Sequence, residues 1–366
     1  MLSKHDIHVL SVFLKDIGDK VIHELTDSAF IGNLPGGLIR DRILDYSLRG
    51  GKHLRPGLMV AACGAVGGNT DPVLPIAVAT EMFHTWTLVH DDIIDRDDHR
   101  RGGLTMHARI LKDFRDCGDL PPGTSCEHLS HSMALLIGDA QHGMVVDMMA
   151  QAGLTGGIAA ELVLHLITRL EGKVLPALLT GEVSDVLQSH EPLERISIDD
   201  IELMLRRKTG ALLTFAVCAG AMIGLNTHDQ THPWIKALCS YGENLGLAFQ
   251  MRDDVLGIIG DAETLGKPIG SDFREGKRTL AVKFAFDHAS PAGRTRIESL
   301  LGKPDMSESE VDEIRNLVLE NGGVEHVESL AERLIAASLT ALDALPESNS
   351  RNILRIIAEY TIYRKK

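Results

Sequence analysis

The chain contains a run of acidic residues that a folding core could not hold without compensation. Residues 88–103 begin as an apolar helix-like run and then place five aspartates within the eight positions 91–98. On a helix with about 3.6 residues per turn, Asp91 and Asp95 lie on the same face, where their carboxylates repel each other unless a cation lies between them. Hard oxygen ligands of this kind suit Mg²⁺, which takes one or two protein carboxylates and completes its shell from water and substrate. The alternative is a solvated acidic helix end.

A second acidic pair follows 162 residues later (253 minus 91), again at the end of an apolar helical run. Residues 247–261 lead through apolar positions to Asp253 and Asp254. Two such clusters facing each other could hold several divalent ions around one anionic group, and a diphosphate fits that description. Taken alone, the second pair would more often be two exposed charges. Together the clusters predict metal-assisted chemistry on a diphosphate.

Five motifs, in order along the chain, carry a resemblance to a known family. They are Gly50–Pro56 (GGKHLRP), the first aspartate cluster with Arg100–Arg101–Gly102, Lys208–Thr209–Gly210, the second aspartate cluster, and Gly266–Lys267–Pro268 followed by Gly276–Lys277–Arg278. From about residue 50 to about residue 279 the chain resembles the trans-type prenyl diphosphate synthases of the polyprenyl synthetase family. Each motif is weak alone, and the five together are specific. The resemblance implies a prenyltransferase that condenses isopentenyl diphosphate with an allylic diphosphate.

Composition predicts an all-α fold. Of the 366 residues 44% are apolar but only 4% are aromatic, and Leu-, Ala- and Met-rich runs at helical spacing outnumber β-branched alternation. A chain of this size can bury one large core. With the resemblance, this predicts one domain over residues 1–366, a helical bundle of the isoprenoid synthase type around a central apolar cavity. Apolar residues between Ile7 and Val21 predict an amphipathic first helix.

Charge and cysteine usage exclude other classes. The formal net charge of -14 argues against a nucleic-acid partner, because a phosphate backbone favours a basic surface. Five scattered cysteines do not form a disulfide framework and predict a reducing compartment. The apolar run 212–225 has 14 residues, fewer than the roughly 20 that cross a bilayer. Because the N-terminus also lacks a signal-peptide pattern, we expect a cytoplasmic protein without a membrane span.

An inserted loop is predicted at about residues 112–130. The stretch is polar and rich in Gly and Pro, where the family usually has a short connection. Cys117, Cys126, His128 and His131 could suggest a zinc site. Their spacing matches no pattern typical of one, so no zinc is expected.

The resemblance assigns roles to particular residues. Mg²⁺ held by Asp91, Asp95 and Asp253 would draw charge off the allylic diphosphate as its carbon–oxygen bond breaks. The residues assigned to diphosphate binding are Lys52, Arg55, His84 and Arg101 for isopentenyl diphosphate, and Arg100, Lys208, Lys267 and Lys277 for the allylic side and its closing loop. Thr209 and Gln250 would turn oxygens toward the carbocation. Released diphosphate would accept the proton.

The same residues have plainer interpretations. Lys52 and Arg55 form a point charge and a planar fork beside the Gly50–Gly51 turn, which suits a diphosphate, but they could be two surface cations. The run Arg206–Lys208 would usually be a solvated face. A lone histidine among apolar residues, such as His84, is more often a satisfied core group.

Product length should be set along the helix that leads to Asp91. Trp86, five residues earlier, resembles the family position at the floor of the product channel, with Met82 and Thr87 near it. Bulk there accompanies short products in the family, while the smaller Thr87 argues against the shortest. The prediction is geranylgeranyl diphosphate (C20), with farnesyl diphosphate (C15) next. The alternative is that Trp86 is ordinary core.

One position departs from the family pattern. Many relatives have a third aspartate in the second cluster where this chain has Gly257, so Asp253 should be the chief ligand, assisted by Asp254 or Asp261. Two rival functions remain. A terpene cyclase shares the fold but needs no second diphosphate grip, and a non-catalytic subunit should have lost aspartates or arginines that are present here. We also expect a homodimer.

Overall fold

The structure is a computed structural model that describes residues 2–118, 121, 123–155, 157–260 and 270–363. The helices are α1 (Lys4–Thr26), α2 (Ala29–Asn33), α3 (Leu38–Arg42), α4 (Asp45–Leu48), α5 (Leu54–Ala65), α6 (Leu74–Ile94), α7 (Met106–Cys117), α8 (Cys126–Thr155), α9 (Ala160–Arg169), η1 (Leu170–Val174), α10 (Leu175–Gln188), η2 (Leu193–Arg195), α11 (Ile198–Leu205), η3 (Arg206–Gly210), α12 (Ala211–Leu225), α13 (Pro233–Ile259), α15 (Ser271–Glu275), α16 (Leu280–His288), α17 (Pro291–Leu300), α18 (Glu308–Glu320), α19 (Gly323–Leu342) and α20 (Asn349–Tyr363). Within the described residues the strands β1 (His99–Arg100) and β2 (Gly103–Leu104) form one short antiparallel pair. The predicted all-α class is confirmed.

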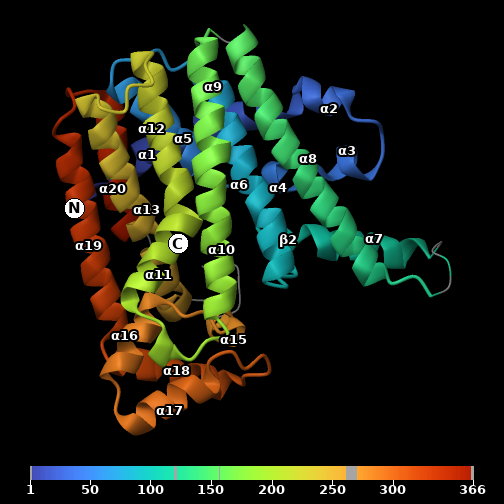
Figure 1. Ribbon diagram of the computed structural model, residues 1–366, viewed down its shortest axis with the longest axis vertical. Coiled ribbons are helices and arrows are strands. Elements are labelled where there is room, and N and C mark those ends of the chain that lie inside the picture. Colours follow the sequence, from blue (N-terminus) through green and yellow to red (C-terminus); the bar gives the residue numbers. More distant parts are fainter. Residues whose placement is uncertain (1, 119–120, 122, 156, 261–269, 364–366) are drawn as a thin grey trace.

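The long helices form a bundle in which α12 and α13 lie inside (Figure 1). Helix α13 packs against α19 on one side and α12 on the other, while α12 also packs against α5. Helix α6 packs along α8, and α7 with the adjoining end of α8 projects from the bundle. Helices α16–α18 close the end of the bundle at which α10 and α13 terminate (Figure 1). The predicted first helix is confirmed as α1, which buries Leu10, Ile17 and Val21.

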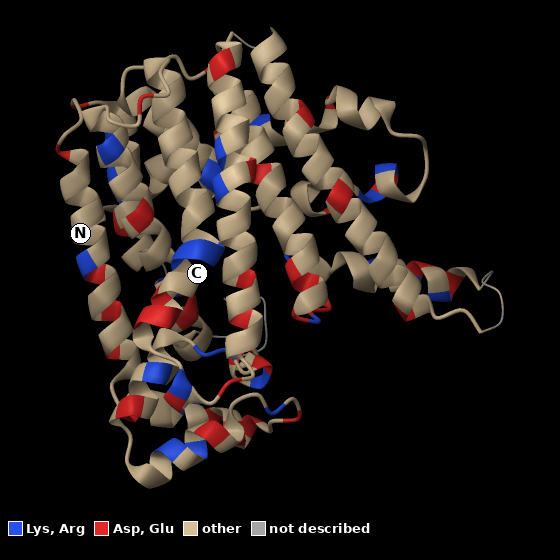
Figure 2. Cartoon of the chain, viewed as in Figure 1, with Lys and Arg blue, Asp and Glu red and all other residues tan. Residues whose placement is uncertain are grey.

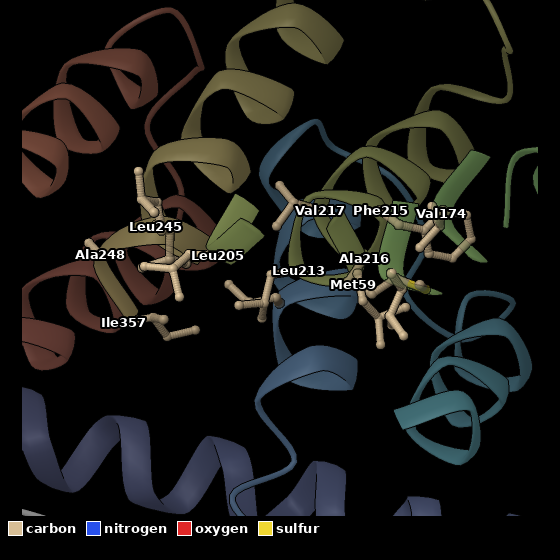
Figure 3. Close-up of a cluster of buried hydrophobic side chains, with 14 of the residues drawn as sticks. Met59, Val174, Leu205, Leu213, Phe215, Ala216, Val217, Leu245, Ala248 and Ile357 are labelled. Atoms are coloured by element: carbon tan, nitrogen blue, oxygen red, sulfur yellow. The ribbon is translucent and has the colours of Figure 1, made fainter. Parts of the chain in front are cut away.

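The centre of the bundle is apolar on every side of α12. A helix that is hydrophobic all round must be buried, and in α12 nearly every residue from Leu212 to Ile223 is. Figure 3 shows part of this cluster, where side chains of α5, α12, α13 and α20 meet. A Cβ added at Gly220 would lie 2.2 Å from the backbone oxygen of Met59. Glycine at this position therefore lets α12 and α5 pack backbone to backbone.

The helical run Ile198–Leu225 is long and apolar enough to cross a bilayer, as judged by length and composition alone. The expectation that no segment reaches this length was wrong, because the helix that contains residues 212–225 begins at Ile198 and continues through η3. In the structure 67% of its most apolar window is buried inside the bundle. A core helix of a folded domain passes the same test.

Two sequence expectations about cysteines and loops need correction. Cys218 of α12 and Cys239 of α13 form a disulfide, with their Cα atoms 5.2 Å apart, because these two helices pack side by side. The predicted insertion at 112–130 is mostly helix, since α7 continues to Cys117 and α8 begins at Cys126. Cys63, Cys117 and Cys126 are free, and the described part of the chain holds no group of three metal-ligating side chains near them.

Candidate active site

The first aspartate cluster lies at the C-terminal end of α6. Asp91 is in the last turn of the helix, and Asp95 follows the helix end with its backbone N–H donating to the carbonyl of Asp91 at 2.7 Å. This spacing puts the two carboxylates on neighbouring positions of one face, as the sequence predicted. Figure 2 shows acidic residues gathered at this end of α6 and on α10.

Asp92, between them in the sequence, turns into the protein and is completely buried. Its Oδ1 accepts a hydrogen bond from Nε of Arg100 at 2.6 Å, and its Oδ2 accepts one from the Tyr46 hydroxyl. The Tyr46 oxygen in turn accepts from the backbone N–H of Met106 at 2.7 Å. Both oxygens of Asp92 are therefore engaged by protein donors, and this carboxylate joins α4, α6, β1 and α7.

The second cluster lies in the last turns of α13, where a chain of hydrogen bonds orients its side chains. Thr209 Oγ1 donates to Gln250 Oε1 at 2.8 Å, and Gln250 Nε2 donates to Asp254 Oδ1 at 2.9 Å. The Gln250 amide is therefore held from both ends, with its oxygen toward Thr209 and its nitrogen toward Asp254. The Thr209 oxygen keeps its lone pairs for another group.

Lys208 lies in η3, a single π-helical turn between α11 and α12. Its Nζ is 2.6 Å from Asp185 and 2.7 Å from Glu182, both on α10. A Cβ at Gly181 would lie 2.5 Å from the backbone nitrogen of Lys208, so glycine is needed where α10 packs on this turn. Burial alone would lower the pKa of Lys208, but these carboxylates and Asp91 raise it above its usual value. The ammonium is therefore charged.

Lys277 lies against the first cluster. It follows α15, and its Nζ lies 3.2 Å from Asp95 and 2.8 Å from Glu275. A cavity of about 350 Å³ lies beside it, between β1, α10, η3, α13 and α15. Residues that line this cavity, called the active-site cavity below, include Arg100, Asp185, Lys208, Asp253, Asp254 and Asp272.

Negative charge accumulates in this region beyond what the lysines balance. Burial, with the charges of Glu182 and Asp95, raises the pKa of Asp91 to about 7. Burial, with the nearby charges of Asp272 and Asp253, raises the pKa of Asp254 to about 8. Carboxyl groups whose pKa is raised this far are destabilised in their ionised form, so a cation bound between them would be stabilising.

The donor set fits Mg²⁺. Asp91, Asp95 and Asp253 offer carboxylate oxygens, the ligands that this ion prefers. Over the described residues no three side chains of His, Cys, Asp or Glu already converge on one point as a closed metal site. An ion that takes few protein ligands and completes its shell from water and phosphate does not need such a site.

A group of basic residues lies near the acidic clusters. Burial lowers the pKa of Arg55 to about 10, while the charges of both Asp91 and Asp253 act on its guanidinium. Arg55 is therefore near both clusters, and its buried Nε has no hydrogen-bond partner among the described residues. Burial, together with Arg55 and Arg101, lowers the pKa of His84 well below its usual value, so its imidazole is neutral.

Other predicted residues are placed differently. Lys52 is exposed and lines a separate cavity of about 500 Å³ between α1 and α20 that also contacts Phe249. Arg101 donates from Nη1 to the carbonyl of Gly50 at 2.6 Å and so holds the glycine turn. Lys267 and Asp261 lie outside the described residues.

The predicted chain-length residues lie between α6 and α8. Trp86 is 8% exposed, packs edge-on against Phe83 and lies 4.7 Å, between ring centroids, from His142 of α8. Met82, one turn earlier, is completely buried. Thr87 is also buried, and its hydroxyl donates to a backbone carbonyl of its own helix at 2.8 Å.

Comparison with known proteins decides the family. The Polyprenyl synthetase family model matches residues 39–318, well over half of the chain. The chain belongs to the polyprenyl synthetase family. The match spans both aspartate clusters.

The synthetase is similar to curated proteins and solved structures over nearly its whole length. It is 30% identical over 321 residues to the geranylgeranyl diphosphate synthase of Saccharolobus solfataricus, covering 87% of each chain. It is 31% identical over 335 residues to the geranylfarnesyl diphosphate synthase of Aeropyrum pernix, covering 89% of this chain and 95% of that one. The crystal structure of a Corynebacterium glutamicum geranylgeranyl pyrophosphate synthase, complexed with isoprenyl diphosphate and magnesium, matches with a TM-score of 0.80 at 29% identity, covering 96% of this chain and 98% of that one.

Three groups of this polyprenyl synthetase had no role predicted from the sequence. Tyr46 is far from Asp92 in the sequence, and no local pattern marks it. The buried pair of His53 and Glu81, 3.4 Å apart, joins α5 to α6 and has no motif either. Asp272 did carry a signal, because it lies between the Gly-Lys-Pro and Gly-Lys-Arg motifs of one loop.

Proposed function

We propose that the protein is a Mg²⁺-dependent trans-prenyltransferase that condenses isopentenyl diphosphate with an allylic diphosphate to give geranylgeranyl diphosphate. The observation that carries this is the position of Lys277, which lines one cavity with Lys208 and with Asp253 and Asp254 of α13, and whose Nζ lies 3.2 Å from Asp95 at the end of α6. Relatives named geranylgeranyl diphosphate synthase support the product length.

The allylic substrate would bind between the aspartates. Asp91, Asp95 and Asp253 would hold Mg²⁺, which supplies positive charge to the leaving diphosphate. Lys208, kept charged by the carboxylates of α10, would bind a phosphate oxygen of the same group. Thr209 would turn its free lone pairs toward the carbocation that forms when the carbon–oxygen bond breaks.

Isopentenyl diphosphate would bind on the basic side. Arg55 has an unpaired buried nitrogen, and the neutral imidazole of His84 beside it can donate one hydrogen bond to a phosphate. Arg101 would add positive charge there, and Lys52, whose side chain lines the separate cavity beside α1, would contribute by turning toward the diphosphate. Holding both substrates in line lowers the entropic barrier, and burial excludes water that would quench the cation. Released diphosphate would accept the proton.

Two alternatives are separated by the same assay. A terpene cyclase would convert one allylic diphosphate without isopentenyl diphosphate, and a non-catalytic subunit would form no product. We expect the purified protein, incubated with Mg²⁺, labelled isopentenyl diphosphate and each allylic primer, to yield a C20 product on chromatography. A C15 product would make it a farnesyl diphosphate synthase, and a cyclised product formed without isopentenyl diphosphate would contradict the proposal.

Replacing Trp86 by alanine should lengthen the product. The indole fills space between α6 and α8, and its removal opens room for about one further isoprene unit or more at the end of the chain. The fraction of product longer than C20 should rise from minor to dominant, as measured by chromatography after dephosphorylation. Trp234, which lies at the start of α13, gives a matched control in Trp234→Ala. Unchanged product length in Trp86→Ala would mean that Trp86 is ordinary core.

We also propose a cytoplasmic homodimer. Large apolar side chains are exposed along α8, α9 and α10, a surface that a second copy would cover: Leu135, Leu136, Leu154, Leu164, Leu179 and Val183. The mass of the protein in solution tests the dimer. The Cys218–Cys239 bridge is an observation against a reducing compartment, and thiol alkylation of freshly extracted protein tests it.

A further inference from the structure

Position 257 on α13 is one helical turn beyond Asp253 and faces the same side of the helix. It is a glycine, and a Cβ built there would lie 2.8 Å from Oδ2 of Asp272. The space that a side chain at 257 would enter is thus occupied by the carboxylate of another element. That carboxylate also lines the active-site cavity, together with Asp253 and Asp254.

The short helix α15 holds Asp272 in this place. Gly270 and Gly276, on either side of α15, have φ of +78° and +75°, which lets the chain turn sharply before and after it. Phe273, the next residue, is 2% exposed and fixes the helix to the core. The backbone carbonyl of Asp272 accepts from the N–H of Lys277 at 2.9 Å, so the carboxylate and the Lys277 ammonium are positioned by one loop.

Asp272 lines the active-site cavity and interacts with its charged groups. Its negative charge acts on Asp254, on Lys277 and on Glu275. A carboxylate placed this close to other acids is repelled by them unless a cation is also bound. Because position 257 has no side chain, the Asp272 carboxylate can approach α13 one helical turn beyond Asp253.

We propose that Asp272 supplies the third carboxylate of the second metal cluster, from α15, in place of the aspartate that many relatives carry at position 257 of α13. With Asp253, it would bind a divalent ion, or a water of that ion, on the diphosphate. The inference rests on the proposed function, and Gly257 is part of it because only a residue without a side chain leaves the carboxylate its place.

The test measures metal binding rather than turnover. Mn²⁺, which also favours carboxylate oxygens, is titrated into the full-length protein in the presence of inorganic diphosphate, and bound ions are counted by electron paramagnetic resonance. We expect Asp272→Asn to weaken the last ion to bind by about tenfold or more, the range found when groups that support a metal are removed. Gly257→Asp added to Asp272→Asn should restore at least part of the affinity, because it returns a carboxylate to the same space.

A matched control is Glu308→Gln, whose carboxylate is 90% exposed on α18, and it should bind Mn²⁺ as the parent protein does. Thermal unfolding of each variant shows that it is folded. Equal Mn²⁺ affinity in Asp272→Asn and parent, or a failure of the double variant to recover any affinity while folded, would overturn the inference. If the parent binds Mn²⁺ and diphosphate but forms no prenyl product, the proposed function fails while the assignment of Asp272 stands.

Discussion

Asp253→Ala should lower kcat/KM for the condensation by about 10³-fold. Asp253 lies on α13, whereas Asp91 lies on α6. Asp254 and Asp272 line the same cavity, but neither occupies the position of the Asp253 carboxylate. Loss of one ligand removes several kcal/mol of charge stabilisation in the transition state, and about 4 kcal/mol corresponds to a factor of roughly 10³. Initial rates with saturating primer, measured against Mg²⁺ concentration, give the value.

The control for Asp253→Ala separates metal loss from misfolding. Asp253→Asn keeps the side-chain volume and should lose nearly as much activity, whereas Asp312→Asn, an exposed acid on α18, should lose none. Excess Mg²⁺ should recover part of the rate if the ligand acts through the ion. Activity within about threefold of the parent would show that the second cluster does not bind the reacting diphosphate.

Asp92→Ala should destabilise the fold by about 3–5 kcal/mol, although Asp92 belongs to the acidic motif in the sequence. The side chain is fully buried, and its removal leaves the Arg100 guanidinium without its closest anion and the Tyr46 hydroxyl without its acceptor. Breaking a buried pair by removing one partner costs that much because a desolvated charge is left uncompensated. Urea unfolding followed by circular dichroism measures the free energy.

Two further variants provide smaller losses of stability with which Asp92→Ala can be compared. Tyr46→Phe removes two hydrogen bonds, the one donated to Asp92 and the one accepted from the Met106 N–H, but keeps the ion pair, so it should cost about 1–3 kcal/mol. Asp98→Asn changes a carboxylate that is 75% exposed and should cost less than about 0.5 kcal/mol. If Asp92→Ala unfolds at the same urea concentration as Asp98→Asn, the buried network does not support the fold.

The sequence predicted the elements that depend on local pattern. Helical periodicity gave the all-α class, and the spacing of Asp91 and Asp95 gave their shared face. The family motifs pointed to Arg55, Lys208 and Lys277, which the structure brings close to the acidic clusters. Their roles in the reaction remain predictions.

What the sequence did not predict depends on packing between distant segments. The Cys218–Cys239 bridge follows from the contact of α12 with α13, and no spacing rule encodes it. The loop at 112–130 was wrong because its polar, Gly- and Pro-rich middle concealed two helix ends. The motifs on either side of Asp272 marked its loop, but the closeness of its carboxylate to Gly257 follows from the packing of α15 on α13.

The π-helical turn η3, which holds Lys208, fixes the rotation of α12 about its axis relative to α11. Such a turn carries one residue more than a regular helix, and each residue rotates the following helix by about 100°. Deleting a single amino acid between Arg206 and Gly210 would therefore turn Gly220 away from Met59 and present a side chain to that backbone oxygen. An insertion or deletion in η3 would therefore disturb two features at once. One is the position of Lys208, and the other is the close packing of α12 on α5 at Gly220, ten residues after Gly210.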